Sequence, residues 1–207
     1  RLSTYRSWGE NMIITVVGLG VVGGSFVKAL KGQGHEVYGI DVDEETLARA
    51  KADGCIKEGF VDGREIIKQS DMTIICLYPS LVLDYIKEHE FKKGSIITDA
   101  VGVKTHFLNE AMNLLKDKDV EFVSGHPMAG RENKGYLYAS KEVFQGANYI
   151  LIQHEQNSKS AIAMMEQFVS NLGFHSVKIM SPQAHDEIIS FTSQLPHVIA
   201  VSLIDSD

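Results

Sequence analysis

This chain of 207 residues has little cysteine, no basic tract and no long apolar run, and each absence excludes a class of protein. Its two cysteines, Cys55 and Cys76, form no Cys-x-x-Cys pattern, so a disulfide framework or a structural zinc site has little support. No apolar run approaches the ~20 residues that a membrane helix requires. The formal net charge is −7 and no Lys/Arg run stands out, which argues against a nucleic-acid partner. Because no secretory signal pattern is found either, we expect a cytoplasmic protein with reduced thiols.

Residues 11–180 alternate between short apolar runs and amphipathic segments. The apolar runs predict strands, and the amphipathic segments with capping residues predict helices. The predicted strands are 12–17, 36–40, 72–77, 95–98, 120–123, 148–152 and 176–179, and the predicted helices are 21–30, 43–52, 80–90, 104–115 and 160–171. Strands that alternate with helices need crossover connections, so we expect an α/β fold with a doubly wound, mostly parallel sheet.

The two ends of the chain differ from this pattern. Residues 1–10 are polar and patternless, which indicates a leader or a remnant outside the fold. From Ser181-Pro182 one long helix is predicted to run toward Asp207, because serine at the N-cap and proline at the first helical position are strong start signals. Pro196 is expected to kink this helix. Its apolar stripe needs a covering surface, so we expect the chain to self-associate.

A glycine-rich segment follows the first predicted strand and opens the first predicted helix. It reads Gly18-Leu19-Gly20-Val21-Val22-Gly23 and fits the pattern G-x-G-x-x-G. The first glycine permits a tight turn, the second lets the backbone approach a pyrophosphate, and the third lets helix and strand pack closely. The helix N-terminus then offers unpaired N–H groups to phosphates. The segment therefore predicts a Rossmann-type dinucleotide site.

Asp41 closes the second predicted strand, 18 residues after Gly23, which is near the spacing of about 20 expected for a ribose-binding acid. A carboxylate accepts hydrogen bonds from the ribose hydroxyls of NAD and repels the 2′-phosphate of NADP. No arginine follows Asp41, so we favour NAD as the cofactor. The alternative is that Asp41 only caps the next helix. Pro79, which stops the third predicted strand, completes the candidate cofactor-binding residues.

His126 lies in a Gly/Pro loop that reads Ser124-Gly125-His126-Pro127-Met128-Ala129-Gly130. The loop follows a predicted strand at the carboxyl end of the sheet, where open α/β sheets bind their ligands. Histidine, with an unperturbed pKa of ~6.5, suits a general base near neutral pH. We expect this ring and the reactive end of the dinucleotide to face one cavity. The alternative is a histidine bonded to its own loop backbone.

A second histidine, His197, shares one face of the long predicted helix with Asp186, Ser190 and Ser193. This polar stripe has two equally supported interpretations, the lining of a cleft or the solvated face of an amphipathic helix. Asp186 and His197 are ~16 Å apart along the helix axis at 1.5 Å per residue, so they form no direct dyad.

Three segments resemble the prephenate dehydrogenase family, which includes arogenate dehydrogenases. They are Gly18-Leu19-Gly20-Val21-Val22-Gly23-Gly24-Ser25, Gly125-His126-Pro127-Met128-Ala129-Gly130-Arg131-Glu132, and His185-Asp186 through Ser193-Gln194-Leu195-Pro196-His197. The resemblance implies NAD(P)-dependent oxidative decarboxylation of prephenate to 4-hydroxyphenylpyruvate. Aromatisation drives loss of the carboxylate, so no metal ion is required.

The resemblance also implies roles for single residues. His126 matches the catalytic histidine that bonds the ring hydroxyl, and His197 matches a histidine that helps place the substrate. Asp186 and Glu132 match acidic residues around the cleft, and Ser193 is counted with the substrate-binding candidates. Arg131 is the candidate partner for a substrate carboxylate, with a solvated loop arginine as the alternative.

The chain departs from the family pattern at two points. The family has a serine in the stretch Asp99-Ala100-Val101-Gly102-Val103-Lys104, where this chain has Gly102. Family members also continue into a C-terminal helical domain that forms a homodimer, so residues 181–207 are expected to begin that domain.

Two rival functions remain open. One is another hydroxyacid dehydrogenase, although such enzymes place a lysine on the long helix, and residues 181–207 contain none. The other is a nucleotide-sensing module without turnover.

Overall fold

Six parallel strands form the central sheet of the computed structural model, which describes residues 11–130 and 133–191. The strands are β1 (Ile13–Val17), β2 (Glu36–Ile40), β3 (Glu58–Phe60), β4 (Met72–Ile75), β5 (Ser95–Asp99) and β6 (Val120–Phe122). Their spatial order is β3-β2-β1-β4-β5-β6, and each neighbouring pair is parallel. This is the order of a doubly wound Rossmann sheet, which confirms the predicted fold class.

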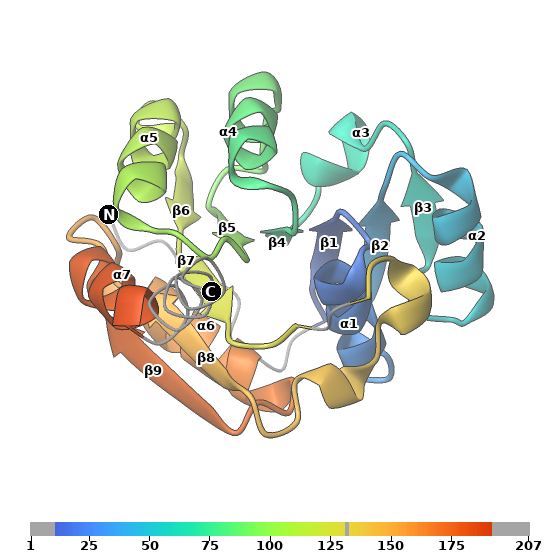
Figure 1. Cartoon of the computed structure of the whole chain (residues 1–207). Coiled ribbons are helices and arrows are strands. Elements are labelled where there is room, and N and C mark those ends of the chain that lie inside the picture. The colour runs from blue at the N-terminus through green and yellow to red at the C-terminus, as the bar shows by residue number, and fades with distance from the viewer. Residues whose placement is uncertain (1–10, 131–132, 192–207) are drawn as a thin grey trace, which may run out of the picture.

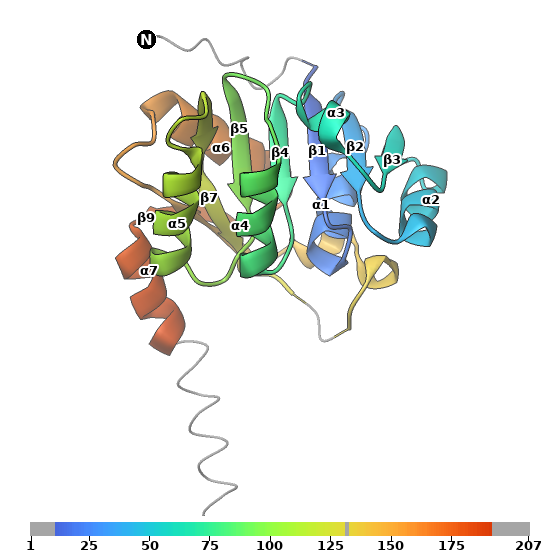
Figure 2. The same ribbon diagram turned by 90° about the horizontal axis from the view of Figure 1, so that it is seen from above.

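Helices lie on both sides of this sheet (Figures 1 and 2). One apolar cluster contains residues of α1 (Val21–Leu30) and α6 (Lys159–Asn171). A second cluster contains residues of α3 (Arg64–Ile67), α4 (Pro79–Glu88) and α5 (Thr105–Leu115). The remaining helix of this part, α2 (Glu44–Ala52), packs beside β3 at the sheet edge. Because the helices change sides between β1 and β4, a crevice opens at the carboxyl ends of these two strands.

Short-range capping explains where several helices begin. The side chain of Asp43 accepts a hydrogen bond from the backbone N–H of Glu45 and caps α2, and Ser158 caps α6 in the same way. Pro79 occupies the first turn of α4, where a missing N–H costs nothing. The N-cap of α1 is Gly20, which has no side chain to offer, and the first turn of α1 has no acidic residue.

Three further strands form a second sheet beside the first. They are β7 (Ser124–Pro127), β8 (Asn148–Ile152) and β9 (Ser176–Met180), with β7 antiparallel and β9 parallel to β8. The predicted loop around His126 is therefore wrong, since this residue pairs with Ile150 in the ladder between β7 and β8. Glycine and proline favoured a loop, but Pro127 is the last residue of an edge strand, a position that tolerates its missing N–H.

The chain that leaves β7 packs onto α1 through two 3₁₀ turns, Tyr136–Tyr138 and Lys141–Val143. Gly24 makes this contact possible, since a Cβ there would lie 2.6 Å from the Cβ of Ala139. Ser25 Oγ accepts a hydrogen bond from the backbone N–H of Ser140, and Lys28 Nζ donates to the carbonyl of Ala139. The strand that carries His126 is thus tied to the helix that follows the glycine turn.

The C-terminal helix α7 (Pro182–Ile189) begins as predicted, with Ser181 as its cap and Pro182 in its first turn. It packs against α5 at the end of the sheet that carries β5 and β6 (Figure 1). The expected kink at Pro196 and the polar stripe through Ser193 and His197 lie outside the described residues. Over 11–130 and 133–191, no helix has the length and apolarity needed to cross a bilayer.

Candidate functional site

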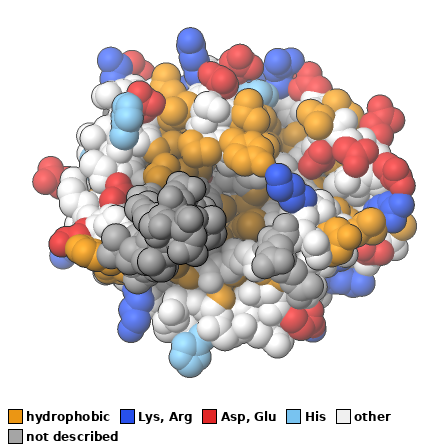
Figure 3. Space-filling view, in the orientation of Figure 1, with side chains coloured by type: hydrophobic (Ala, Val, Ile, Leu, Met, Phe, Trp, Pro, Cys, Tyr) orange, Lys and Arg blue, Asp and Glu red, His pale blue; other side chains and the backbone are white. Residues whose placement is uncertain are grey.

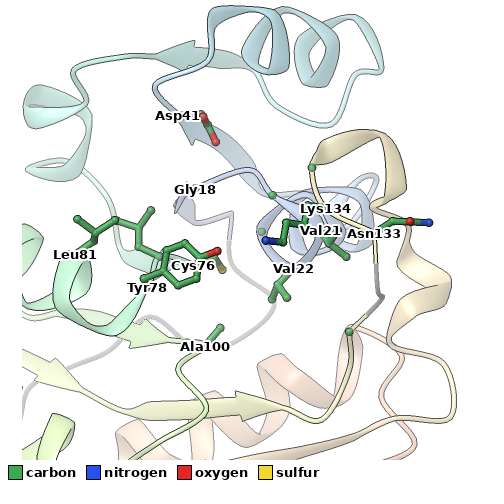
Figure 4. Close-up of a pocket in the computed structure, with 15 residues that line it drawn as sticks. Gly18, Val21, Val22, Asp41, Cys76, Tyr78, Leu81, Ala100, Asn133 and Lys134 are labelled. Carbon is green, nitrogen blue, oxygen red and sulfur yellow. The ribbon is translucent and has the colours of Figure 1, made fainter.

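A cavity of about 490 Å³ lies over the glycine turn at the crevice between β1 and β4 (Figure 4). Hydrophobic side chains gather around a central hollow on the same face of the molecule (Figure 3). The first half of the sheet, the second half and the chain after β7 all contribute to the lining of the cavity, with Gly18, Gly20, Val21, Val22, Gly23, Asp41, Cys76, Leu77, Tyr78, Leu81, Ala100, Gly130, Asn133, Lys134 and Gly135.

The glycine turn has the geometry that a pyrophosphate site needs. Gly18 has φ +82°, and a Cβ there would lie 2.6 Å from the carbonyl oxygen of Cys76. A Cβ on Gly23 would lie 1.8 Å from the carbonyl oxygen of Gly18, so only glycine lets α1 approach the turn. At Gly20, by contrast, no atom lies within 4 Å of the Cβ position. The N-terminus of α1 therefore faces open space with bare N–H groups, which favours an anion there.

Asp41 lines this cavity and also holds the turn in place. Its Oδ2 accepts a hydrogen bond of 2.6 Å from the backbone N–H of Leu19, and its Oδ1 accepts one of 3.0 Å from Asp43. Leu19 itself is buried and does not line the cavity, and Pro79 lies in α4 directly after the lining residue Tyr78. Since α2 is capped by Asp43, the alternative in which Asp41 serves only as that cap is wrong.

A second hollow of about 350 Å³ continues on the other side of Asp41. Most of its lining is apolar, and it includes Val17, Ile40, Val42, Val61, Leu77, Leu81 and Tyr85. A carboxylate between an anion-binding turn and an apolar slot suits a ligand with phosphates, a sugar and a flat ring.

A buried ion pair lies between the two sheets. Lys104 and Asp99 are both fully buried, and Lys104 Nζ donates to Asp99 Oδ2 over 2.6 Å. The same ammonium donates to Ser124 Oγ (2.9 Å) and to the carbonyl of Gly125 (2.7 Å), so all three of its donors are used. Burial lowers the pKa of Lys104, and the charge of Asp99 opposes that shift. The pair fixes the backbone directly before His126.

His126 belongs to a chain of hydrogen bonds that ends on α5. Its Nδ1 lies 2.8 Å from Nε2 of the buried His185, whose Nδ1 lies 2.8 Å from Oδ1 of Asp186. The Asp186 carboxylate also accepts the backbone N–H groups of Lys104 (2.9 Å) and Thr105 (2.7 Å) at the start of α5. On the opposite side of the His126 ring, a Cβ at Gly102 would lie 3.5 Å from Nε2.

Burial, together with the charge of Lys104, lowers the pKa of His126 to about 4. Burial also lowers the pKa of His185. Partial burial would raise the pKa of Asp186, but its hydrogen bonds, first those from Thr105, outweigh burial and hold the pKa at about 2. Near neutral pH, His126 and His185 are therefore neutral imidazoles, and Asp186 is an ionised carboxylate.

The sequence prediction placed His126 and Asp186 in the site but gave no role to His185 or to the Lys104–Asp99 pair. The signals available for His185 were its position directly before Asp186 and its place in a segment that resembles the family. Arg131, Glu132, Ser193 and His197 lie outside the described residues. His126 is not among the lining residues of the 490 Å³ cavity, so a shared cavity stays a prediction. Ala100, two residues before Gly102, does line it.

Comparison with known proteins agrees with this geometry. A family model described as the prephenate dehydrogenase nucleotide-binding domain matches residues 26–178. Prephenate dehydrogenase of Bacillus subtilis is 30% identical over 199 residues, which is 92% of this chain and 52% of that protein. Cyclohexadienyl dehydrogenase of Zymomonas mobilis is 28% identical and covers 92% of this chain. The chain spans about half the length of the prephenate dehydrogenases of B. subtilis and Lactococcus lactis.

Two solved structures have nearly the same fold. Prephenate dehydrogenase from Aquifex aeolicus, crystallised with hydroxyphenyl propionate and NAD⁺, has a TM-score of 0.85 and 27% identity and covers 95% of this chain and 69% of its own. Synechocystis arogenate dehydrogenase has a TM-score of 0.86, 27% identity and coverages of 94% and 69%. A 3-hydroxyisobutyrate dehydrogenase from Salmonella typhimurium, at 15% identity, shares the fold alone. From the matched domain, the relatives and the glycine turn, we conclude that this chain belongs to the prephenate dehydrogenase family.

Proposed function

We propose that this chain carries the nucleotide-binding part of an NAD-dependent enzyme that oxidatively decarboxylates prephenate to 4-hydroxyphenylpyruvate, in tyrosine biosynthesis. The observation that carries the proposal is the placement of His126. Its Nε2 faces the side-chain-free position at Gly102, on the loop that also supplies Ala100 to the cavity over the glycine turn. A basic nitrogen beside a nucleotide site is what oxidation of a ring alcohol requires.

The lining of the cavity fits NAD. The open space at Gly20 and the bare N-terminus of α1 suit the pyrophosphate, and the apolar hollow beyond Asp41 suits the adenine ring. Asp41 suits the ribose hydroxyls and disfavours a 2′-phosphate. Lys134, which lines the cavity near the turn, adds a cation for the phosphates (Figure 4). The bound NAD⁺ of the A. aeolicus relative supports the same choice.

The residues of the chain supply placement and proton handling. NAD⁺, when bound, supplies the acceptor for the hydride. His126 accepts the proton of the ring hydroxyl at Nε2 while the carbon below loses hydride. When carbon dioxide leaves, its electron pair aromatises the ring, and the proton returns from Nε2 to the ring oxygen. No net proton is released, so His126 begins and ends neutral, in keeping with its lowered pKa. Such a base commonly contributes 10²–10⁴-fold to the rate.

The remaining site residues are proposed on the family resemblance. Arg131 would pair with a substrate carboxylate, with Glu132 at the cleft mouth, and Ser193 and His197 would help to place the ring. For Asp186, the contacts with His185 and with the N-terminus of α5 favour a positioning role over direct contact with substrate. We also propose a cytoplasmic homodimer that associates through the helical region that begins near residue 181.

Arogenate is the second candidate substrate. The Synechocystis arogenate dehydrogenase and the Zymomonas cyclohexadienyl dehydrogenase resemble this chain about as closely as the prephenate dehydrogenases do. The two substrates differ in side-chain charge, because arogenate carries an ammonium group where prephenate carries a ketone. Parallel assays with both compounds decide between them.

The test is turnover of prephenate with NAD⁺, followed at the absorbance of NADH, in the parent protein and in His126→Asn. We expect the variant to lose about 10²-fold or more in kcat. Its affinity for NAD⁺, measured by calorimetry, should stay within about twofold, because His126 does not line the nucleotide cavity. An equal loss of NAD⁺ binding would contradict the assignment of His126 as the base. NAD⁺ binding with no oxidation of either substrate would favour the sensing module.

A further inference from the structure

The imidazole of His126 has two nitrogens, and only the one that lacks a proton can act as a base. Its Nδ1 lies 2.8 Å from Nε2 of His185. One of these two nitrogens must donate and the other accept, so the distance alone allows two arrangements. In one arrangement the free lone pair of His126 is on Nε2, and in the other Nε2 carries the proton and no base faces Gly102.

Asp186, at the far end of this series of hydrogen bonds, determines which atom donates in each of them. An ionised carboxylate only accepts hydrogen bonds. Asp186 receives the backbone N–H groups of Lys104 and Thr105, which are fixed donors at the start of α5, and its third partner is His185 Nδ1. These backbone donors stabilise the ionised form of the carboxylate. The proton in the third contact must therefore be on His185 Nδ1.

The tautomer of His185 in turn determines which nitrogen donates in its hydrogen bond with His126. Its side chain is fully buried, and its two ring nitrogens are both used by protein atoms, Asp186 on one side and His126 on the other. A neutral imidazole with a proton on Nδ1 has only a lone pair on Nε2. Hence His185 Nε2 accepts, and His126 Nδ1 donates.

The charged groups around His126 keep this arrangement neutral. Lys104 and His185 oppose a positive charge on the His126 ring, while Asp99 and Asp186 favour one. Lys104 and Asp99 are paired with each other and fully buried, and Asp99 offsets only part of the effect of Lys104. Burial then favours the neutral ring. A neutral ring with a proton on Nδ1 has its lone pair on Nε2, beside Gly102.

We propose that His185 is a positioning residue that holds His126 in its Nδ1–H tautomer and so directs the basic Nε2 toward the space at Gly102. Its importance for catalysis rests on the proposed function, because it presumes that His126 is the base. The tautomer itself does not depend on that function and can be measured without substrate.

The direct test is NMR of the 207-residue chain labelled with ¹⁵N-histidine, using long-range correlations between ring nitrogens and ring carbon-bound protons at pH 7. The His126 signals are assigned by their absence from His126→Asn. We expect His126 Nδ1 to show the shift of a protonated nitrogen and Nε2 that of an unprotonated one. A proton on Nε2 of His126 in the parent chain would overturn the proposal.

Two substitutions at position 185 then test whether His185 determines the tautomer of His126. His185→Phe removes the acceptor, so His126 should lose its Nδ1–H preference and kcat should fall about 10²-fold. His185→Gln keeps an oxygen that can accept from Nδ1 and should restore much of the preference and the rate. His175→Phe, at an exposed histidine, is the control and should change neither. KM for NAD⁺ should stay unchanged throughout, which a general loss of structure would not produce.

The outcomes separate the two proposals. If the parent shows the Nδ1–H tautomer but oxidises neither prephenate nor arogenate, the proposed function fails while the tautomer assignment stands. If the parent is active and His185→Phe leaves both tautomer and kcat unchanged, the positioning role of His185 is wrong while the proposed function stands.

Discussion

The two halves of the candidate site are held by different forces. At the glycine turn, close backbone packing fixes the geometry, because Gly18 and Gly23 leave no room for a side chain. At His126, a buried ion pair and a line of polar side chains fix the geometry, and their partners are distant in sequence, 59 residues apart for His126 and His185 and 82 for Lys104 and Asp186. The first arrangement tolerates no added atom, and the second tolerates no missing partner. An added side chain should therefore damage the glycine turn, and the removal of a polar partner should damage the His126 half.

The largest effect should come from Lys104→Met. The change leaves the Asp99 carboxylate buried without its cation, and breaking a buried pair costs about 3–5 kcal/mol. The free energy of unfolding in urea measures the loss. The control is Arg49→Met, which breaks an exposed pair with Glu45 and should cost less than about 1 kcal/mol. Equal losses in the two variants would mean that the polar cluster does not hold the His126 half.

The glycine turn should respond to an added methyl group instead. Gly23→Ala places a Cβ against the carbonyl of Gly18, so we expect a loss of about 1–3 kcal/mol in stability together with NAD⁺ binding. Gly20→Ala meets no atom and should cost about 1 kcal/mol or less, yet weaken NAD⁺ binding because the methyl group projects into the cavity. Calorimetric titration and urea unfolding separate the two. Unimpaired NAD⁺ binding by Gly20→Ala would place the pyrophosphate elsewhere.

A change of charge at the edge of the cavity should alter cofactor choice by a smaller amount. Asp41→Ser removes the carboxylate, so the ratio of the Kd values for NADP⁺ and NAD⁺ should fall by about tenfold, equivalent to ~1.4 kcal/mol. Asp43→Ala is the matched control, since it removes the α2 cap at a cost of about 1 kcal/mol and leaves the cavity lining intact. A ratio that moves equally in both variants would show that Asp41 does not select the cofactor.

A separate effect is a pH dependence of stability that belongs to the His126 half. The folded-state pKa of His126 is about 4, below its ordinary value of 6.5, so the unfolded chain binds more protons between these values. Stability should fall as pH falls from about 6.5 to about 4. The slope should be smaller in His126→Asn, with a remainder from His185 and His35, whose pKa values burial also lowers. The exposed His106→Asn is the control, and a slope altered as much there would contradict the assignment.

Sequence patterns predicted the nucleotide half well because its determinants are local. The bounds of α1 and β2 agree with the predicted ranges to the residue, and the glycine turn has the predicted geometry. The short elements β3 and α3 were missed, since three or four residues carry too little periodicity. The His126 half was predicted only in part. Nothing local shows that Lys104 reaches Gly125 or that His185 reaches His126, and strand periodicity does not reveal that β7 joins a second sheet.

Gly24 complicates any alanine scan of the glycine-rich segment. It stands next to Gly23 in the chain, but its missing side chain accommodates Ala139 and Tyr136 rather than the turn. An alanine at position 24 would push the segment with Tyr136 and Ala139 away from α1. It would thereby weaken the contacts that tie the His126 strand to this helix. Loss of activity in such a variant would look like a damaged cofactor loop, although the fault would lie on the far side of the helix. Gly23 and Gly24 are thus neighbours in the chain, but substitutions at them affect different halves of the candidate site.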